Sequence, residues 1–448
     1  MSPKCSLKLL VFWDLVKRKK PKIFALFLGK SLANLVKMDS FLKQVMRILI
    51  VTQHFPPEKG AVRRLFEFAR YFVKNGIDVS VMTAIPNYPD GIVPKKYRGK
   101  FFYKEEFDGV KVYRSWVLPA SNSQPKKRMV GFITFLVTTV WNSFRLKGKY
   151  DIVLASTPPV TSPVIGWIIS KIKRCRFVIE VRDLQPESSE DFGNLNQSLF
   201  TRVIRSIIHT LYRKADRLVP VTDGIANFMF KIGISRDKVA TIKSGVSSEF
   251  IQADTNGIRN KFGWEEKFLV LYSGTLGWVR PLETVIEAAR HLADQPDIHF
   301  VFLGDGQKRE ALENMVRDYG LKNVSFIGLQ PLDTIPYFLK SSDVLVESLK
   351  EVKVARMAFP SKMFEYMAAG RPIIFGSLQG EAIDELNLAG GSLTYASDCP
   401  EALADIIMKL KLGEIDGDEL GNRYHEHITK YHCREIWAER YLNFVKSV

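Results

Sequence analysis

Residues 359–375 are the most informative part of the chain and read Phe359-Pro-Ser-Lys-Met-Phe-Glu-Tyr-Met-Ala-Ala-Gly-Arg-Pro-Ile-Ile-Phe375. The pattern predicts a buried helix that ends at Gly370, because a glycine just past a helix with a proline behind it marks a C-terminus. The run after Pro372 then predicts a central strand of a parallel sheet. The helix carries one acid, Glu365. A buried carboxylate is unfavourable unless something pairs with it, and a ligand bearing hydroxyl groups is one such partner.

Strand-like and helix-like segments alternate on the N-terminal side of this stretch. Apolar runs predict strands at 47–52, 78–83, 110–117, 151–155, 177–181 and 217–221, and a second series at 268–272, 299–303, 324–327, 343–346 and 373–375. Such alternation predicts parallel sheets covered by helices on both faces. The expected fold class is α/β, with two doubly wound, Rossmann-like domains that face each other across a cleft. Ligands of such sheets bind beyond the carboxyl ends of the strands.

The length of 448 residues also favours two domains. We assign residues 46–250 to an N-terminal domain and 251–430 to a C-terminal domain. Residues 431–448 form an amphipathic helix that we expect to pack back on the first domain. Residues 1–45 mix lysine-rich and apolar clusters and do not match the start of a Rossmann unit. They fit either a poorly ordered extension or a basic amphipathic membrane anchor.

Charge is divided unevenly between the two halves. Residues 1–250 contain 43 Lys and Arg against 19 Asp and Glu, a balance of +24, whereas residues 251–448 contain 22 against 29, a balance of −7. A basic half indicates a polyanionic surface, either nucleic acid or an anionic membrane leaflet. Residues 129–141 follow Lys126-Lys-Arg128 and predict either a buried core helix or an interfacial helix whose apolar face enters the headgroup region. The basic charge favours the interfacial helix.

Cysteine spacing and apolar run length bear on the compartment. The four cysteines, Cys5, Cys175, Cys399 and Cys433, show neither a disulfide framework nor a zinc-binding spacing, which favours a reducing environment. No secretory signal and no apolar run of about 18–20 residues is apparent. We therefore expect a cytoplasmic protein, peripheral on the inner face of the cell membrane.

Several segments, in their order and spacing, resemble the retaining glycosyltransferases of family 4 over about residues 46–445. They are the loop Phe55-Pro-Pro-Glu-Lys-Gly60, the hinge turn Ser244-Gly-Val246, the loop that begins Tyr272-Ser-Gly-Thr275, the turn Phe302-Leu-Gly-Asp-Gly306, and the stretch 359–375. The segment Glu180-Val-Arg-Asp-Leu-Gln-Pro-Glu187 resembles the subgroup that builds bacterial surface polysaccharides of the capsule, O-antigen and colanic-acid type.

This resemblance implies a GT-B fold and a retaining sugar transfer. The donor would be a nucleoside diphosphate sugar, and the acceptor a polyprenyl-diphosphate-linked saccharide at an anionic membrane surface. The resemblance implies neither a cofactor nor a metal ion, and no nucleic acid partner; other polysaccharide-assembly enzymes are candidate partners.

The resemblance also implies roles for individual residues. Arg280 stands where the family has a lysine that clamps the diphosphate, and Thr275 stands where an arginine is usual, so Lys362 is expected to supply the second cation. Glu365 is expected to bind the donor ribose. Asp183 follows an apolar strand and is the third catalytic candidate, with a helix cap as the alternative. The expected donor-binding residues are Gly60, Gly274, Thr275, Gly304, Gly306, Glu365 and Glu381.

One departure from the family pattern concerns the donor sugar. The family usually has a further glutamate eight positions before the ribose-binding one, and Met357 stands there in this chain. His54, at the end of the first strand, fits a structural hydrogen bond or a ligand contact. Two other functions remain open: a nucleotide-sugar 2-epimerase of the same architecture, and a non-catalytic membrane-binding or nucleic-acid-binding protein.

Overall fold

The computed structural model of the chain describes residues 45–58, 62–122, 124–193, 198–255, 257–377 and 379–448. The predicted N-terminal extension lies outside the described residues except for Val45, and so does Gly60. Residues from Arg47 to Val448 form one compact unit. Within this unit the chain builds two separate sheets, one from each half.

The first sheet has the strand order β3-β4-β2-β1-β5-β6-β7. Its neighbours pair in parallel except β3, which is antiparallel to β4. Its order reverses between β1 and β5, which places a topological switch point there. The strands are β1 (Arg47–Val51), β2 (Asp78–Ala84), β3 (Phe102–Phe107), β4 (Val110–Ser115), β5 (Ile152–Ser156), β6 (Arg176–Val181) and β7 (Arg217–Pro220).

The second sheet is parallel in every pairing, with the order β10-β9-β8-β11-β12-β13. Its switch point lies between β8 and β11, where the loops after the two strands diverge and leave room for a ligand. The strands are β8 (Phe268–Ser273), β9 (Ile298–Leu303), β10 (Val324–Gly328), β11 (Val344–Ser348), β12 (Ile373–Gly376) and β13 (Leu393–Tyr395).

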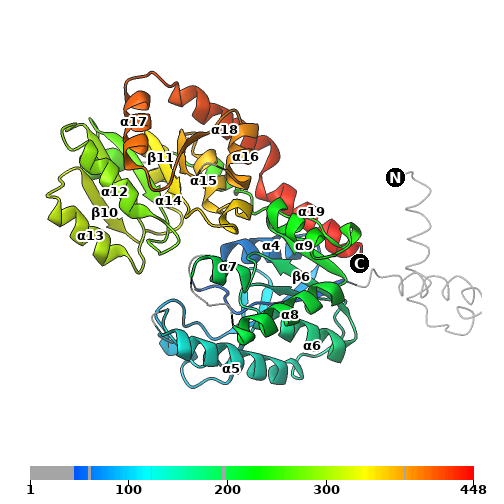
Figure 1. Cartoon of the computed structure of the whole chain (residues 1–448). Helices are drawn as coiled ribbons and strands as arrows, with labels where there is room; N and C mark the ends of the chain where they lie inside the picture. Colours follow the sequence, from blue (N-terminus) through cyan, green and yellow to red (C-terminus); the bar gives the residue numbers. More distant parts are fainter. Residues whose placement is uncertain (1–44, 59–61, 123, 194–197, 256, 378) are drawn as a thin grey trace, which may run out of the picture. The chain divides into compact units, whose positions relative to one another are not determined.

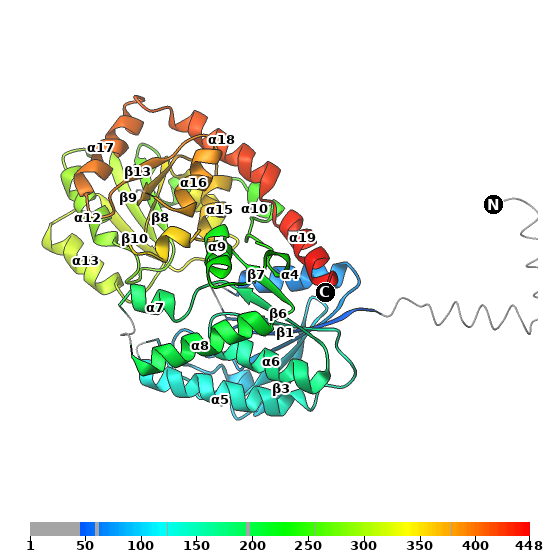
Figure 2. The same ribbon diagram turned by 45° about the vertical axis from the view of Figure 1, so that its right-hand side comes forward.

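Helices cover both faces of the sheets (Figures 1 and 2). In the second half, α12 and α17 share one apolar core with the sheet, whereas α14, α15, α16 and α18 share another. The helices of the first half are α4 (Arg63–Lys74), α5 (Pro125–Ser143), α6 (Thr161–Lys173), α7 (Glu187–Asp191), α8 (Leu199–Lys214) and α9 (Asp223–Lys231). Those that follow are α10 (Ser248–Gln252), α11 (Ile258–Phe262), α12 (Leu282–His291), α13 (Arg309–Asp318), α14 (Ile335–Ser341), α15 (Lys362–Ala368), α16 (Glu381–Leu388), α17 (Pro400–Lys411), α18 (Gly417–Tyr431) and α19 (Arg434–Lys446).

The chain passes between the halves twice, and the two passages are bonded together. Val246 and Cys433 form an isolated parallel bridge, in which the Val246 N–H donates to the carbonyl of His432 at 3.0 Å. After this bridge α19 lies against α4, as Figure 2 shows. The Tyr441 ring centroid lies 5.5 Å from the ring centroids of Phe68 and Phe72, so the last helix buries its aromatic face on the first half.

The structure confirms the fold class and differs from the predicted strands at one edge of each sheet. At the edge of the second sheet, β13 lies beyond the last predicted strand. β3 is an antiparallel strand that the parallel pattern did not predict. It turns into β4 through Asp108 and Gly109, which have φ values of 49° and 79°. An Asp-Gly pair with positive φ is the preferred two-residue hairpin turn, so this dipeptide was the signal for the missed strand.

Within the part of the chain that the structure describes, no helix combines the length and the apolar character needed to cross a membrane.

Candidate functional site

Two glycine loops lie against each other at the carboxyl edge of the second sheet. Gly274 follows β8 and Gly304 follows β9; an ideal Cβ on Gly304 would lie 2.0 Å from the Gly274 carbonyl oxygen. A Cβ on Gly306 would lie 2.3 Å from the Leu276 carbonyl oxygen. Both positions therefore exclude a side chain, and the two loops present closely packed backbone at the switch point.

The two predicted cations meet at a buried acid, Glu347, the fourth residue of β11. Arg280 Nη1 lies 2.8 Å from Glu347 Oε1, and Lys362 Nζ contacts Glu347 Oε2. The Glu347 side chain is 0% exposed. Glu347 was not among the predicted site residues, because the predicted strand ended one position before it. An acid at the end of a buried strand beside a switch point was the available signal.

Lys362 is held by its surroundings on several sides. Its Nζ donates to the Ser273 carbonyl at 2.9 Å and lies 3.9 Å from the centroid of the Tyr272 ring. Burial, together with the nearby Arg280 guanidinium, lowers the pKa of Lys362 well below its ordinary value. Thr275 is exposed beside these groups, and its carbonyl accepts a hydrogen bond from the Tyr272 hydroxyl at 2.8 Å.

Glu365 lies on α15, one turn beyond Lys362, and meets the first half of the chain. Its Oε1 is 3.5 Å from Nη1 of Arg63, in the first turn of α4. Burial raises the pKa of Glu365, although Arg63 and Lys362 oppose that effect. The carboxylate keeps a 24% exposed side chain, so it is still accessible to a ligand.

Met357, which replaces the family's further glutamate, packs on the first half. Its carbonyl accepts a hydrogen bond from the Thr222 hydroxyl at 2.7 Å, and a Cβ on Gly224 would lie 2.6 Å from the Met357 Cα. The Met357 side chain packs against the apolar core of the first sheet. A carboxylate at this position would therefore have to leave that apolar surface.

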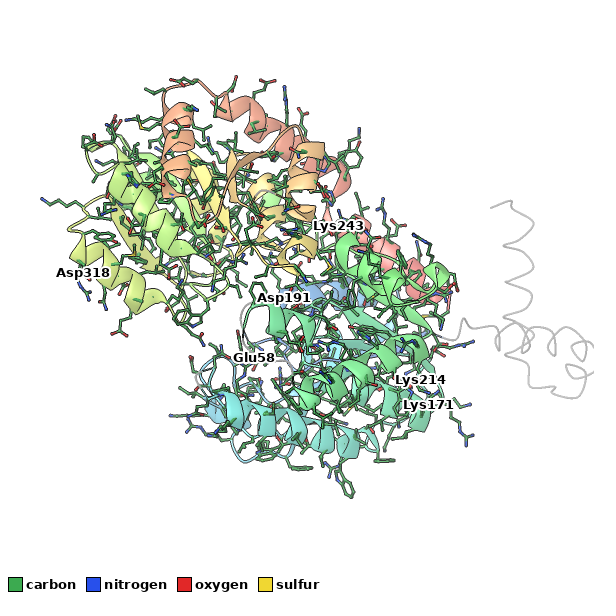
Figure 3. The ribbon with its side chains drawn as sticks, in the orientation of Figure 1. Glu58, Lys171, Asp191, Lys214, Lys243 and Asp318 are labelled. Atoms are coloured by element: carbon green, nitrogen blue, oxygen red, sulfur yellow. The ribbon has the colours of Figure 1, made fainter. Side chains whose placement is uncertain are left out.

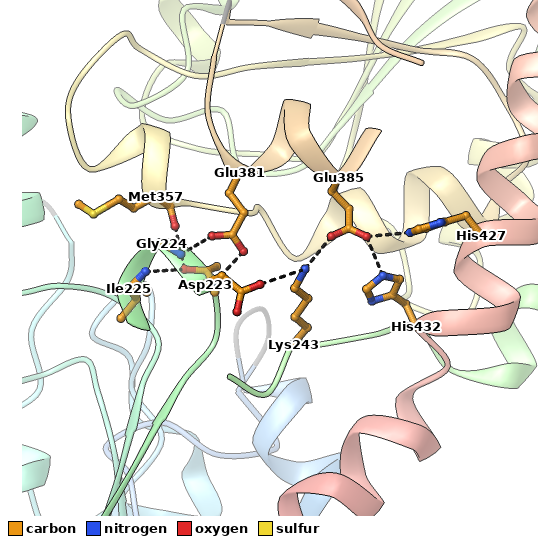
Figure 4. Close-up of polar contacts among 10 residues, drawn as sticks. Asp223, Gly224, Ile225, Lys243, Met357, Glu381, Glu385, His427 and His432 are labelled. Atoms are coloured by element: carbon orange, nitrogen blue, oxygen red, sulfur yellow. Dashed lines mark hydrogen bonds and ion pairs between the residues drawn. The ribbon is translucent and has the colours of Figure 1, made fainter. Parts of the chain in front are cut away.

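Glu381 also contacts the first half (Figure 4). Its two oxygens accept the backbone N–H groups of Asp223 at 2.9 Å and Gly224 at 2.6 Å. These N–H groups belong to the first turn of α9, where a carboxylate is favourable. Burial raises the pKa of Glu381, against the effect of those hydrogen bonds. Glu381 is the first residue of its own helix, α16, and its carboxylate binds the N-terminus of α9.

Glu385, one turn further along α16, joins the two chain passages. His427 and His432 Nε2 each lie 2.7 Å from Glu385 Oε1, and Lys243 Nζ lies 2.6 Å from Oε2. Figure 4 shows these groups converging, and Figure 3 shows Lys243 beside the second half. Although burial opposes it, these hydrogen bonds hold the pKa of Glu385 well below its usual range. The three Glu and His atoms are close enough to hold a metal ion, but Lys243 already occupies the other carboxylate oxygen.

Asp183 lies in the first half, two residues after the end of β6. Its carboxylate accepts a hydrogen bond from the Ser188 hydroxyl in the first turn of α7, and burial raises its pKa. The neighbouring Arg182 donates from Nε to the Thr157 carbonyl at 2.7 Å. Asp183 is therefore at the carboxyl edge of the first sheet, whereas Arg280 and Lys362 are at that edge of the second.

His54 makes a structural contact at the end of β1. Its Nδ1 lies 2.8 Å from Glu58 Oε2, while Glu58 Oε1 accepts the N–H groups of Asn87 and Tyr88. The imidazole thus orients a carboxylate that organises the loop after β2.

Two neighbouring helices of the first half expose apolar side chains. α5 and α8 both contact α6. Val130 is exposed on α5, and the four other exposed apolar residues of that helix recur every four positions, which places those four on one side. These residues are Met129, Ile133, Val137 and Trp141 on α5, and Leu199, Phe200, Val203 and Ile207 on α8. Lys126 and Lys127, at the start of α5, are exposed next to them.

Two protein-family models match the chain, one on each half. Residues 59–245 match the glycosyl transferase 4-like domain, and residues 254–430 match the glycosyl transferases group 1.

Similar proteins include enzymes named for polysaccharide assembly. The chain is 26% identical over 355 residues to the putative colanic acid biosynthesis glycosyl transferase WcaI of Escherichia coli, covering 76% of this chain and 85% of WcaI. It is 26% identical over 242 residues to the lipopolysaccharide core biosynthesis glycosyltransferase LpsE of Rhizobium meliloti, covering 53% and 66%. The fold is similar to that of Anabaena HepE, solved with UDP and glucose, with a TM-score of 0.68 and 17% identity over 90% of this chain and all of HepE.

The glycine loops allow a test of their packing. We expect Gly306→Ala to lower the free energy of unfolding by about 2 kcal/mol, because its Cβ overlaps the Leu276 carbonyl. Gly277→Ala in the same loop is the matched control, since its nearest new contact is 3.5 Å away. Urea denaturation of both variants measures the difference. An equal loss of unfolding free energy in the two variants would contradict the close packing of the two loops.

The Glu385 contacts predict a pH-dependent stability. Because its folded-state pKa is lowered, the stabilisation from Glu385 is complete above the ordinary glutamate pKa and is lost as the pH falls below it. Glu385→Gln should therefore lower the free energy of unfolding by about 3 kcal/mol near neutral pH, and by progressively less below about pH 4.5. Denaturation across this range measures the effect, with the exposed Glu419→Gln as control. A deficit that does not depend on pH would contradict the assigned ion pairing.

Proposed function

Because the chain belongs to the family 4 glycosyltransferases with the GT-B fold, we propose that it transfers a sugar, with retention, from a nucleoside diphosphate sugar to a lipid-linked saccharide. The relatives named for colanic acid and lipopolysaccharide core biosynthesis support a role in bacterial surface polysaccharides. Capsule synthesis is part of this proposal. The nucleotide sugar is a substrate in this proposal, and no cofactor or metal ion takes part.

The observation that carries the proposal is the placement of two cations beside two glycine loops at a switch point. Arg280 and Lys362 come from different segments and converge on Glu347 next to Gly274. Close backbone without side chains, with fixed cations beside it, suits a diphosphate. The UDP in the similar HepE structure supports a nucleotide in the same kind of fold.

Charge development explains why these residue types serve the reaction. When the bond between the anomeric carbon and the diphosphate breaks, negative charge grows on the leaving oxygen. Arg280 and Lys362 would stabilise that charge more in the transition state than in the ground state. The leaving phosphate would assist attack from the same face, which accounts for retention.

We assign the remaining contacts of the donor from the resemblance to the family 4 enzymes. Glu365 would accept hydrogen bonds from the ribose, and the backbone of Gly304 and Gly306 would lie near the base. Asp183 would face the acceptor, since it lies at the carboxyl edge of the other sheet. Glu381 would contribute to the donor site indirectly, by holding α9 of the first half against α16 of the second.

A lipid-linked acceptor accounts for the surface of the first half. α5 and α8 expose apolar side chains, and basic residues flank them. Helices of this kind enter the headgroup region of a membrane with their apolar side, while their lysine and arginine side chains contact anionic lipid. This arrangement supports a peripheral location on the inner face of the cell membrane, where a polyprenyl-linked acceptor would be available.

The donor reaction can be tested by nucleotide release. UDP-, GDP- and dTDP-sugars are incubated with the full chain, with and without membrane lipid extract, in buffer and in EDTA. We expect lipid-dependent release from one donor, unchanged by EDTA. Arg280→Ala should lower kcat/KM about 100-fold, and Glu365→Ala should raise the KM for the donor about tenfold.

A matched arginine controls for nonspecific loss of charge. Arg290→Ala removes an exposed arginine of α12 that pairs with Glu287, and should leave release unchanged. Loss of activity in Arg290→Ala equal to that in Arg280→Ala would refute the assigned role, and absence of release from every donor would refute the transferase proposal.

The membrane surface can be tested by flotation with vesicles of phosphatidylcholine and phosphatidylglycerol. The double variant Ile133→Asp, Val137→Asp should reduce binding at least about tenfold, because it removes two apolar contacts and adds repulsion. Leu388→Asp with Leu412→Asp is the control, since those leucines are also exposed but lie in the second half. Equal vesicle binding by wild type and the α5 variant would contradict the proposal. So would tighter binding of the wild-type chain to nucleic acid than to vesicles.

A further inference from the structure

The cations of the proposed diphosphate site already share an anion inside the chain. Glu347 Oε1 lies 2.8 Å from Arg280 Nη1 and accepts the Ser348 N–H at 2.9 Å, while Oε2 contacts Lys362 Nζ. All of these contacts lie beside the switch point of the second sheet. These contacts place two positive charges, Arg280 and Lys362, and one negative charge, Glu347, where the diphosphate is expected to bind.

The three charged side chains of this cluster differ in how far they are exposed to solvent. The Arg280 and Lys362 side chains are 17% and 15% exposed, whereas the Glu347 side chain is 0% exposed. The cations therefore lie between the carboxylate and solvent. A ligand that arrives from solvent meets the cations first, with Glu347 behind them.

Lys362 is also confined on its protein side. The Tyr272 ring centroid lies 3.9 Å from Nζ, and a Cβ on Gly274 would lie 2.9 Å from the same atom. Arg280 and Lys362 repel each other, and neighbouring backbone leaves Lys362 little room to move away. Two like charges in this setting require a counter-anion, since an unpaired buried charge is strongly destabilising.

We propose that Glu347 is the internal counter-anion of the diphosphate site: it positions Arg280 and Lys362 side by side in the free chain and limits their attraction for the nucleoside diphosphate. This inference rests on the proposed function. A carboxylate directly behind two cations repels an anionic ligand that binds in front of them. The affinity for the nucleoside diphosphate is thereby kept low enough for release after transfer.

The test uses Glu347→Gln, which keeps the shape of the side chain and removes its charge. The free variant should melt at a lower temperature than wild type, because the two cations lose their anion. UDP, GDP and dTDP are then added, and the nucleotide that stabilises wild type should stabilise the variant by more. Calorimetry should show about tenfold tighter binding of that nucleotide by the variant. The matching nucleoside, which lacks the phosphates, should show no such gain.

A second acid of the same kind provides the control. Glu105 on β3 also joins an arginine and a lysine, Arg114 and Lys96, but in the first half of the chain. Glu105→Gln should lower the melting temperature and leave the affinity for the nucleotide unchanged. A gain in affinity confined to Glu347→Gln cannot arise from a general loss of stability.

The outcomes separate this inference from the proposed function. If no nucleoside diphosphate stabilises wild type, the donor proposal is wrong and the role of Glu347 with it. If one stabilises wild type and the variant binds it equally or more weakly, only the counter-anion role is wrong. A variant recovered only when the nucleotide is present supports the role. A variant that fails to fold with and without nucleotide, while Glu105→Gln folds, overturns it.

Discussion

The hydrogen-bonded pair of chain passages near Val246 and Cys433 is the constraint on which the rest of the structure depends. Two sheets with separate cores can work on one substrate only if the chain between them is held. Lys243 before one passage and His432 at the other both bond to Glu385 of α16. The same helix places Glu381 on the first turn of α9. A single helix of the second half thus fixes both the passages and a helix of the first half.

Several buried charged groups among the described residues are held by partners from distant segments of the chain. Arg64 of α4 lies 3.5 Å from Glu180 of β6 and donates to the Ile242 carbonyl at 2.7 Å. Arg434 at the start of α19 donates to the Ser244 and Gly245 carbonyls, and burial lowers its pKa to about 9. Because an unpaired buried charge is so unfavourable, these contacts specify where the passages and α19 must lie. Structural specificity and the placement of the candidate site therefore share one physical basis.

The candidate site differs from these structural pairs in its geometry. Arg280 and Lys362 surround one acid from two segments and keep part of their surface in solvent. The glycine loops beside them have no space for side chains. Cations that remain partly exposed beside close backbone can accept an anionic ligand, whereas Arg64 and Arg434 are satisfied within the chain. Partial exposure and close backbone therefore fit the proposed diphosphate-binding role of Arg280 and Lys362.

The sequence by itself determined the fold class and the succession of two sheets, because strand–helix alternation is a local pattern. It also predicted Arg280 and Lys362 as the cations of the candidate site, partly from the stretch 359–375. It missed β3, whose Asp108-Gly109 turn was readable, and Glu347, which lies one residue beyond the predicted strand. Only the tertiary structure decided that Arg280 and Lys362 share Glu347, that Met357 packs on the first core, and that Glu381 contacts α9. These contacts join residues far apart in the chain. Their partners follow from how the sheets and helices pack in space, which sequence periodicity does not encode.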